Sequence, residues 1–230
     1  MAGSWIIFIV FAGISALVSW QLRRKFAEYS QIGLTNGMSG ADIAETMLRE
    51  NGVTGVTVQS VEGQLTDHYN PQDRTVNLST DVFYGRSVAA AAVAAHECGH
   101  AVQHNVAYAP LKLRSALVPV LSVSSQWMQW IILGGVFLLN TTPIPLAIGV
   151  GLFAITTLFS FITLPVEFDA SNRALAWIQS KGIVNSREYP LAKDALWWAA
   201  TTYVVAALGS LATLLYYVSL LMGGSGRRSN

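Results

Sequence analysis

The chain has 230 residues, of which 52% are hydrophobic and only 12% charged, and its net charge is +1. A soluble domain of this length usually has about 25% charged residues, so the composition indicates that much of the chain contacts lipid. The small net charge leaves no basic excess for binding nucleic acid. The single cysteine, Cys98, has no partner for an internal disulfide.

Four apolar stretches are predicted to cross a bilayer: residues 5–20, 116–139, 144–164 and 196–222. The last three contain no Asp, Glu, Lys or Arg, and each has about the 20 residues that spanning requires. The first is shorter, but it is also uncharged and is followed by three basic residues, Arg23 to Lys25. Because no basic region precedes its apolar core, we interpret it as a retained anchor and not as a cleaved signal peptide.

The distribution of Lys and Arg predicts the orientation. Segments 21–114 and 165–195 hold twelve of the 14 Lys and Arg residues, and only Arg227 and Arg228 fall on the other side. Cytoplasmic segments carry the excess of Lys and Arg, so both large segments are placed in the cytoplasm and both termini outside. Side chains from the two segments can therefore meet at one site.

The first cytoplasmic segment is predicted to form a small α+β unit. In chain order we expect a helix, two strands, a short helical turn and a longer helix: residues 39–52, 56–61, 75–79, 79–85 and 87–106. A turn at 70–73 separates the two strands. The strand at 75–79 has two interpretations. It either offers an exposed edge to which a substrate backbone adds, or it is an ordinary strand that covers the helix.

The longer helix carries the HExxH motif His96-Glu97-Cys98-Gly99-His100. Two histidines four residues apart lie on one face of a helix and can bind one zinc ion, and Glu97 lies beside that point, where it can take a proton from the attacking water. Cys98 is predicted to be a small core residue. Gly99 is expected to allow close packing against another helix.

A catalytic zinc usually has a third protein ligand and a water. His104 continues the series of histidines, but it lies about 12 Å along the helix axis from His96 at 1.5 Å per residue. We therefore expect His104 to lie at the surface, toward the substrate, or in a hydrogen bond to a ligand.

The better candidate for the third ligand is Glu167, which follows the third span directly. A carboxylate so close to lipid is costly unless it is paired or bound to a metal. Pro165 is expected in the first turn of a new helix that carries Glu167. Asp169 is the weaker candidate, because an ion pair with Arg173 four residues later explains it.

Three blocks of the sequence, residues 67–79, 87–103 and 164–174, resemble the YugP-like family of bacterial neutral membrane zinc metallopeptidases. The resemblance implies zinc bound by His96, His100 and Glu167, with Glu97 as the base. More distantly, residues 167–170 are similar to the Glu-x-x-Ala-Asp of HtpX-like gluzincin membrane peptidases. Those proteins have Asp where this chain has Ser171, so a weaker hydroxyl or another residue must orient the histidine here.

A metallopeptidase also needs a hydrogen-bond donor that stabilises the oxyanion. The candidates are His68, Tyr69, Arg173, Arg187 and Tyr189. For His68 and Tyr69 the alternative is a pair of residues that stabilises the neighbouring turn.

We therefore predict a mostly α membrane protein, with four transmembrane helices and a small cytoplasmic α+β zincin-like catalytic unit. The predicted divisions are an anchor, the unit with the HExxH helix, a transmembrane hairpin, a cytoplasmic helix with the third ligand, and a last transmembrane helix with its tail: residues 1–22, 23–114, 115–164, 165–195 and 196–230. The predicted function is a zinc endopeptidase, with one Zn²⁺ per chain, that acts on membrane or membrane-associated proteins.

Two alternatives remain open from the sequence. One is an intramembrane protease of the site-two type, against which the short segment between Arg86 and His96 argues. The other is a membrane scaffold or chaperone subunit with a silent metal site, against which the intact Glu97 argues. The partners we expect are a peptide or protein substrate and the lipid bilayer, without nucleic acid, and the oligomeric state is open.

Overall fold

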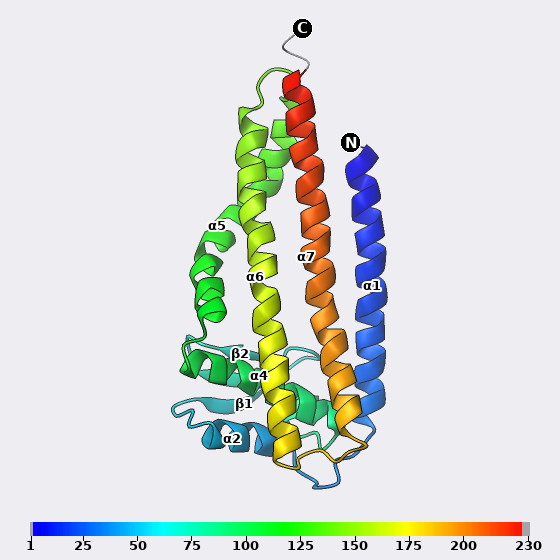
Figure 1. The fold of residues 1–230 in the computed structure, drawn as a ribbon, viewed down its shortest axis with the longest axis vertical. Coiled ribbons are helices and arrows are strands. Elements are labelled where there is room, and N and C mark those ends of the chain that lie inside the picture. Colours follow the sequence, from blue (N-terminus) through cyan, green and yellow to red (C-terminus); the bar gives the residue numbers. More distant parts are fainter. Residues whose placement is uncertain (1, 227–230) are drawn as a thin grey trace. The chain divides into compact units, whose positions relative to one another are not determined.

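The computed structural model describes residues 2–226 (Figure 1). The elements in chain order are α1 (Ala2–Ser30), α2 (Gly40–Glu50), β1 (Thr57–Val61), β2 (His68–Asn70), β3 (Thr75–Ser79), α3 (Thr80–Phe83), α4 (Val88–Asn105), α5 (Ala109–Phe137), α6 (Ile144–Ser180) and α7 (Tyr189–Gly226). They form two compact units. The membrane unit comprises residues 2–17, 113–164 and 203–226, and the mixed unit comprises residues 18–112 and 165–202.

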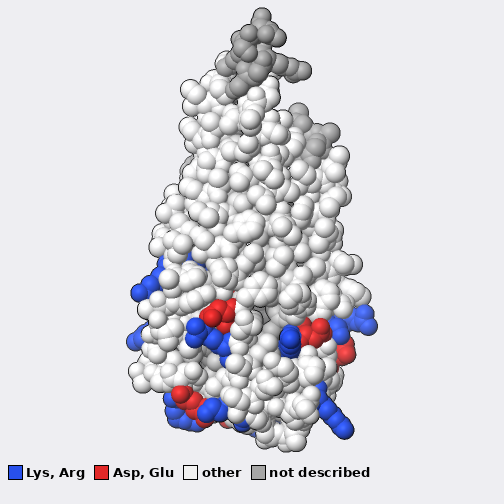
Figure 2. Space-filling model, in the orientation of Figure 1, with Lys and Arg blue, Asp and Glu red and all other residues white. Residues whose placement is uncertain are grey.

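The four predicted spans are confirmed as helices that are long and apolar enough to cross a membrane. They occupy Trp5–Ser30, Ala109–Phe137, Ile144–Ser180 and Tyr189–Gly223, so each helix extends beyond its apolar stretch. Among the described residues, Arg114 is the only charged residue of the membrane unit. Figure 2 shows the same division, since the charged side chains on the visible face gather over the mixed unit. Arg227 and Arg228, which entered the prediction of orientation, lie outside the described residues.

The expected helix start at Pro165 is wrong, because α6 runs from Ile144 to Ser180 without a break. Proline removes one backbone hydrogen bond from a helix interior. The helix persists because the residues after Pro165 are held by packing: Val166, Ala170 and Ala174 are fully buried. One helix therefore carries both a predicted span and the segment with Glu167.

The sheet of the mixed unit has the strand order β1-β3-β2. β1 pairs parallel with β3, and β2 pairs antiparallel with β3 in the register Tyr69↔Val76. The two predicted strands are confirmed, whereas the three-residue β2 was not anticipated. Of the two interpretations of Thr75–Ser79, the exposed edge is wrong and the ordinary sheet strand is confirmed. The chain returns through the turn after β2, so β3 has a partner on both sides and β1 and β2 form the two edges.

α4 lies at the centre of the mixed unit because its N-terminal half consists of small residues. Ser87 caps the helix with its hydroxyl, which accepts a hydrogen bond from the Ala90 N–H at 3.2 Å. The alanines from Ala89 to Ala95 are at most 1% exposed. Small side chains let α2 and the sheet approach closely, and burial of their apolar surface stabilises the unit. The predicted helix at α2 is confirmed with a full capping box between Ser39 and Asp42.

Candidate metal centre

Three side chains with metal-binding atoms converge in the mixed unit. His96 and His100 extend from one face of α4, and Glu167 extends from α6. The Nε2 atoms of His96 and His100 lie 3.4 and 3.5 Å from Oε2 of Glu167. One ligand atom from each residue lies within 4.8 Å of the others. The proximity of these three residues, expected from helix geometry and from the resemblance, is therefore present in the structure.

Gly99 allows α4 and α6 to approach closely enough for this arrangement. A Cβ atom at residue 99 would lie 2.6 Å from the carbonyl oxygen of Ala170, which is a backbone atom and cannot swing aside. The neighbouring Cys98 is fully buried, and its thiol donates to the carbonyl oxygen of Ala44. Burial raises the pKa of this thiol well above its ordinary value. The predicted roles of both residues, close packing and core, are confirmed.

The second ring nitrogen of each histidine is held by a hydrogen bond. Nδ1 of His96 lies 3.1 Å from Oγ of Ser171, and Nδ1 of His100 lies 3.0 Å from Oε1 of Gln103. These contacts leave both Nε2 atoms facing Glu167. Two imidazoles and one carboxylate are the donor set that zinc takes in catalytic sites, with a fourth position left for water or substrate. The residues present therefore fit a zinc ion.

The electrostatics of the cluster also favour a cation. Burial alone would lower the pKa of His100, but the hydrogen bond to Glu167 and the charges of Glu97 and Glu167 outweigh burial and raise it. Both histidines and the carboxylate are largely shielded from water. A cation bound among them would meet negative charge in a medium that screens it poorly.

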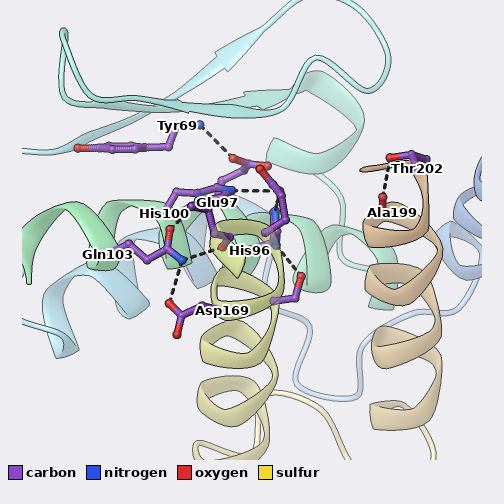
Figure 3. Close-up of polar contacts among 11 residues, drawn as sticks. Tyr69, His96, Glu97, His100, Gln103, Asp169, Ala199 and Thr202 are labelled. Carbon is purple, nitrogen blue, oxygen red and sulfur yellow. Dashed lines mark hydrogen bonds and ion pairs between the residues drawn. The ribbon is translucent and has the colours of Figure 1, made fainter. Parts of the chain in front are cut away.

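The side chain of Glu97 extends from α4 toward Tyr69 of β2 (Figure 3). Its Oε2 accepts a hydrogen bond of 3.0 Å from the backbone N–H of Tyr69 in β2, and the side chain is largely buried. The ring of Tyr69 points away from Glu97 in the same view. Glu97 is therefore held beside the histidines by a backbone donor.

Asp67, just before β2, was not anticipated from the sequence. Its carboxylate accepts hydrogen bonds from the backbone N–H of Ser79 at 2.7 Å and from the Ser79 hydroxyl. Burial and the charge of Glu97 raise the pKa of Asp67. Since Ser79 ends β3, these bonds tie the loop before β2 to the central strand.

His68, Tyr69 and His104 have partners outside the group of His96, His100 and Glu167. Nδ1 of His68 contacts the carbonyl of Thr66 at 2.7 Å, and Nε2 contacts the amide of Asn77 at 3.2 Å. These contacts join the His68 ring to the loop before β2 and to β3. The phenol of Tyr69 lies 2.7 Å from Nδ1 of the exposed His104, which is not part of the ligand cluster.

Arg173 forms the expected ion pair with Asp169, with Nε 2.6 Å from Oδ2. Its guanidinium also lies 5.9 Å from the centre of the Tyr108 ring. The same Asp169 oxygen accepts a second hydrogen bond, from Gln103. Sequence reasoning missed Gln103, although a polar residue one turn beyond His100 on a buried helix face was a signal that could have found it.

Comparison with known proteins gives two matches and one absence. The sequence model of the family described as "Putative neutral zinc metallopeptidase" matches residues 4–222. The chain is 42% identical over 212 residues to "Putative membrane protease YugP" of Bacillus subtilis (strain 168), which covers 92% of this chain and 93% of that protein. No solved structure matches the chain.

Proposed function

The chain belongs to the neutral zinc metallopeptidase family, and from that premise we propose that it is a zinc endopeptidase of the membrane. In this proposal His96, His100 and Glu167 bind one zinc ion, and Glu97 is the general base. The observation that carries it is the convergence of three metal-binding atoms within 4.8 Å, with Glu97 next to His96 on the same helix.

Glu97 performs the proton transfers in this proposal. When bound, Zn²⁺ lowers the pKa of a water to about 7 and polarises the carbonyl of the peptide bond to be cleaved. Glu97 accepts a proton from the attacking water and passes it to the amine of the leaving product. The Tyr69 N–H engages one carboxylate oxygen of Glu97, which limits the rotation of the side chain and keeps it near the histidines.

The substrate backbone is expected to bind along β2. Within the described range, β2 is at the end of the sheet, so its outer edge has no strand partner. An extended peptide can add to such an edge through backbone hydrogen bonds. Because the Tyr69 N–H at this edge contacts Glu97, a peptide bound there would lie beside the general base.

Membrane or membrane-associated proteins are the proposed substrates. Glu167 follows residue 164, the predicted end of the third span, by three residues on the continuous helix α6. This separation is about 4.5 Å along the helix axis at 1.5 Å per residue. A ligand so close to the end of a span supports cleavage of segments that lie next to the membrane surface.

The catalytic unit is proposed to face the cytoplasm, with both termini outside, because of the bias in Lys and Arg. Cysteine accessibility in intact cells tests this placement. In a chain with Cys98 replaced by alanine, Gln72→Cys in the exposed turn after β2 should resist a membrane-impermeant thiol reagent. Thr141→Cys, in the exposed turn between α5 and α6, is the matched control and should react. The reverse pattern would invert the orientation.

The two alternatives make different predictions. A site-two-type protease places its HExxH helix inside a span, whereas α4 is not among the four helices apolar enough to cross a membrane within residues 2–226. A scaffold with a silent metal site would not depend on Glu97. The test is therefore a substitution that changes only the acid-base chemistry of this residue.

Glu97→Gln should keep the fold and one zinc per chain, because the amide has nearly the same shape and Glu97 is not a ligand in this proposal. Cleavage should fall by about 10²–10⁴-fold, the typical contribution of a general base. Glu45→Gln, at an exposed position of α2, is the matched control. Proteomics of cells that carry each form would identify membrane-protein fragments made only by the wild type and the control.

Two results would contradict this proposal. A Glu97→Gln protein that produces the same fragments at a near-normal rate would exclude Glu97 as the base and favour the scaffold. Loss of zinc from the purified Glu97→Gln protein would mean that Glu97 binds the metal, and the set of ligands would have to be redrawn.

A further inference from the structure

A continuous line of hydrogen bonds runs from Arg173 to His100. Gln103 lies one turn beyond His100 on α4 and is fully buried. Its Oε1 lies 3.0 Å from Nδ1 of His100, and its Nε2 lies 2.7 Å from the carbonyl oxygen of Val166 and 2.8 Å from Oδ2 of Asp169 (Figure 3). Arg173 completes the line with its hydrogen bond to the same Asp169 oxygen.

The partners of Gln103 determine how its amide is oriented. The Val166 carbonyl and the Asp169 carboxylate both accept hydrogen bonds, so the NH₂ end of the amide must face them and the oxygen end must face His100. An amide oxygen can only accept, so Nδ1 of His100 must carry a hydrogen. A neutral imidazole with hydrogen on Nδ1 has its lone pair on Nε2, and Nε2 is the atom that faces Glu167.

The two histidines differ in this respect. Ser171 holds Nδ1 of His96 through a hydroxyl, which can donate or accept and therefore does not select a tautomer. Of the two histidines, only His100 has a partner whose donor and acceptor ends are fixed by other residues. Asp169 fixes them together with the Val166 carbonyl, because its carboxylate is paired with Arg173 at 2.6 Å and accepts from Gln103 at the same time.

We propose that Gln103 and Asp169 are positioning residues for the metal, in which Asp169 orients the Gln103 amide and the amide holds His100 with Nε2 available for zinc. This inference rests on the proposed function, because it takes His100 as a zinc ligand. The carboxylate of Asp169 lies two residues before Ser171 and acts on His100, not on His96, through the Gln103 amide.

The competing explanation is that Gln103 only ties α4 to α6 through Val166. Zinc affinity separates the two, measured by competition with a chromogenic chelator on the full-length protein in detergent. Gln103→Leu has a similar volume and removes the acceptor for His100, so it should weaken zinc binding about 10–100-fold. The visible spectrum of the Co²⁺-loaded protein should change as well, while the circular dichroism of the zinc-free protein should not. Gln179→Leu, at an exposed position of α6, is the control.

Variants of Asp169 provide a second test, which stays informative if the Gln103→Leu protein does not fold. Asp169→Ala should weaken zinc binding, and Asp169→Asn should restore most of it, because the Asn oxygen can still accept from Gln103. In the Gln103→Leu background, Asp169→Ala should have no further effect, since Asp169 acts only through the amide.

The outcomes distinguish a failure of the positioning role from a failure of the proposed function. If the wild type binds zinc and Gln103→Leu binds it equally well, the positioning role is wrong and the proposed function stands. If Asp169→Asn binds zinc as weakly as Asp169→Ala, or if Asp169→Ala weakens zinc binding equally in both backgrounds, the effect comes from the charge of Asp169. The proposed action of Asp169 through the Gln103 amide is then wrong. If the wild type binds no zinc, the proposed function fails and this inference fails with it.

Discussion

The mixed unit and the membrane unit use polar side chains in different ways. In the mixed unit, buried polar groups join segments that are distant in the sequence: Gln103 of α4 bonds to α6, and Glu188 accepts from the backbone and the hydroxyl of Thr35. In the membrane unit, most Ser and Thr hydroxyls return to their own helix, as Thr156 and Ser160 do with the carbonyls four residues earlier.

The two units also differ in what holds their elements together. The mixed unit buries a continuous apolar core away from water, so the hydrophobic effect stabilises it. Helices in lipid gain little from that effect and associate through close packing of small residues. The close approaches of Gly135 to Leu146 and of Gly149 to Ile132 are of this kind. Directional bonds between elements are therefore concentrated where side chains must hold a fixed geometry, whereas the helices of the membrane unit associate mainly by close packing.

The largest expected effect is the loss of zinc when a proposed ligand is removed. His96→Ala or Glu167→Ala should reduce bound zinc from one per chain to nearly none, because two ligands do not make a catalytic zinc site. His104→Ala should keep the zinc, since its partner is Tyr69. Metal analysis after dialysis measures all three. Full zinc in Glu167→Ala would move the third ligand elsewhere, and Asp169 would be tested next.

The next largest effect is expected from the same substitution, glycine to alanine at a close helix contact, made once in each unit. Gly99→Ala and Gly135→Ala would bring Cβ atoms to 2.6 and 2.5 Å from backbone atoms, and each should cost about 1–3 kcal/mol of unfolding free energy. Only Gly99→Ala should also weaken zinc binding, because it separates α4 from α6. Urea unfolding in detergent and zinc competition measure the two effects.

Gly134→Ala is the control for that pair, because nothing lies within 4 Å of a Cβ atom at residue 134. It should leave both the unfolding free energy and the zinc affinity unchanged or slightly improve the former, since Ala is the better helix former. A loss of zinc affinity in Gly135→Ala would show that the metal site depends on packing in the membrane unit.

A smaller effect concerns the cap of α2. Ser39→Ala should cost about 1 kcal/mol, the typical value of an N-cap side chain. Hydrogen bonds from the Ser39 hydroxyl and backbone N–H lower the pKa of Asp42. The stabilisation is therefore fully present above the unfolded pKa of about 3.9 and is lost as the pH falls through the lower native pKa. The difference in unfolding free energy between wild type and Ser39→Ala should shrink on acidification from pH 6 to 3, and a growing difference would contradict this assignment.

The smallest effect is expected in the membrane unit. Thr157 and Ser210 join α6 to α7 through hydroxyls 2.8 Å apart. Hydrogen bonds between helices in lipid contribute about 0.6 kcal/mol on average. A double-mutant cycle with Thr157→Val and Ser210→Ala should give a coupling of this size. A coupling of several kcal/mol would mean that directional bonds hold the membrane unit as well.

The parts of the structure that were predictable depend on spacing within one helix. The common face of His96 and His100, the buried Cys98 and the pair of Asp169 with Arg173 all follow from separations of two to four residues. The apolar stretches of the four spans are likewise local properties of the sequence.

The parts that were not predictable depend on contacts between distant segments. β2 has three residues, too few to show alternation, and its pairing made β3 the central strand. Pro165 indicated a helix start by local rules, whereas α6 is continuous and buries Val166, which follows the proline. The bond from Gln103 to Asp169 needs the crossing of α4 and α6, which no spacing in the sequence specifies.

The close approach of α4 and α6 also bears on how much information the HExxH pattern carries in this protein. The two positions written as x are constrained here by their neighbours. Residue 98 fills a core position with no exposure, and residue 99 faces a backbone oxygen 2.6 Å from where a Cβ would be. A relative that retains this helix crossing must place a small side chain at the first position and glycine at the second. A search pattern that states all five residues would therefore reject far more chance matches than one that states three.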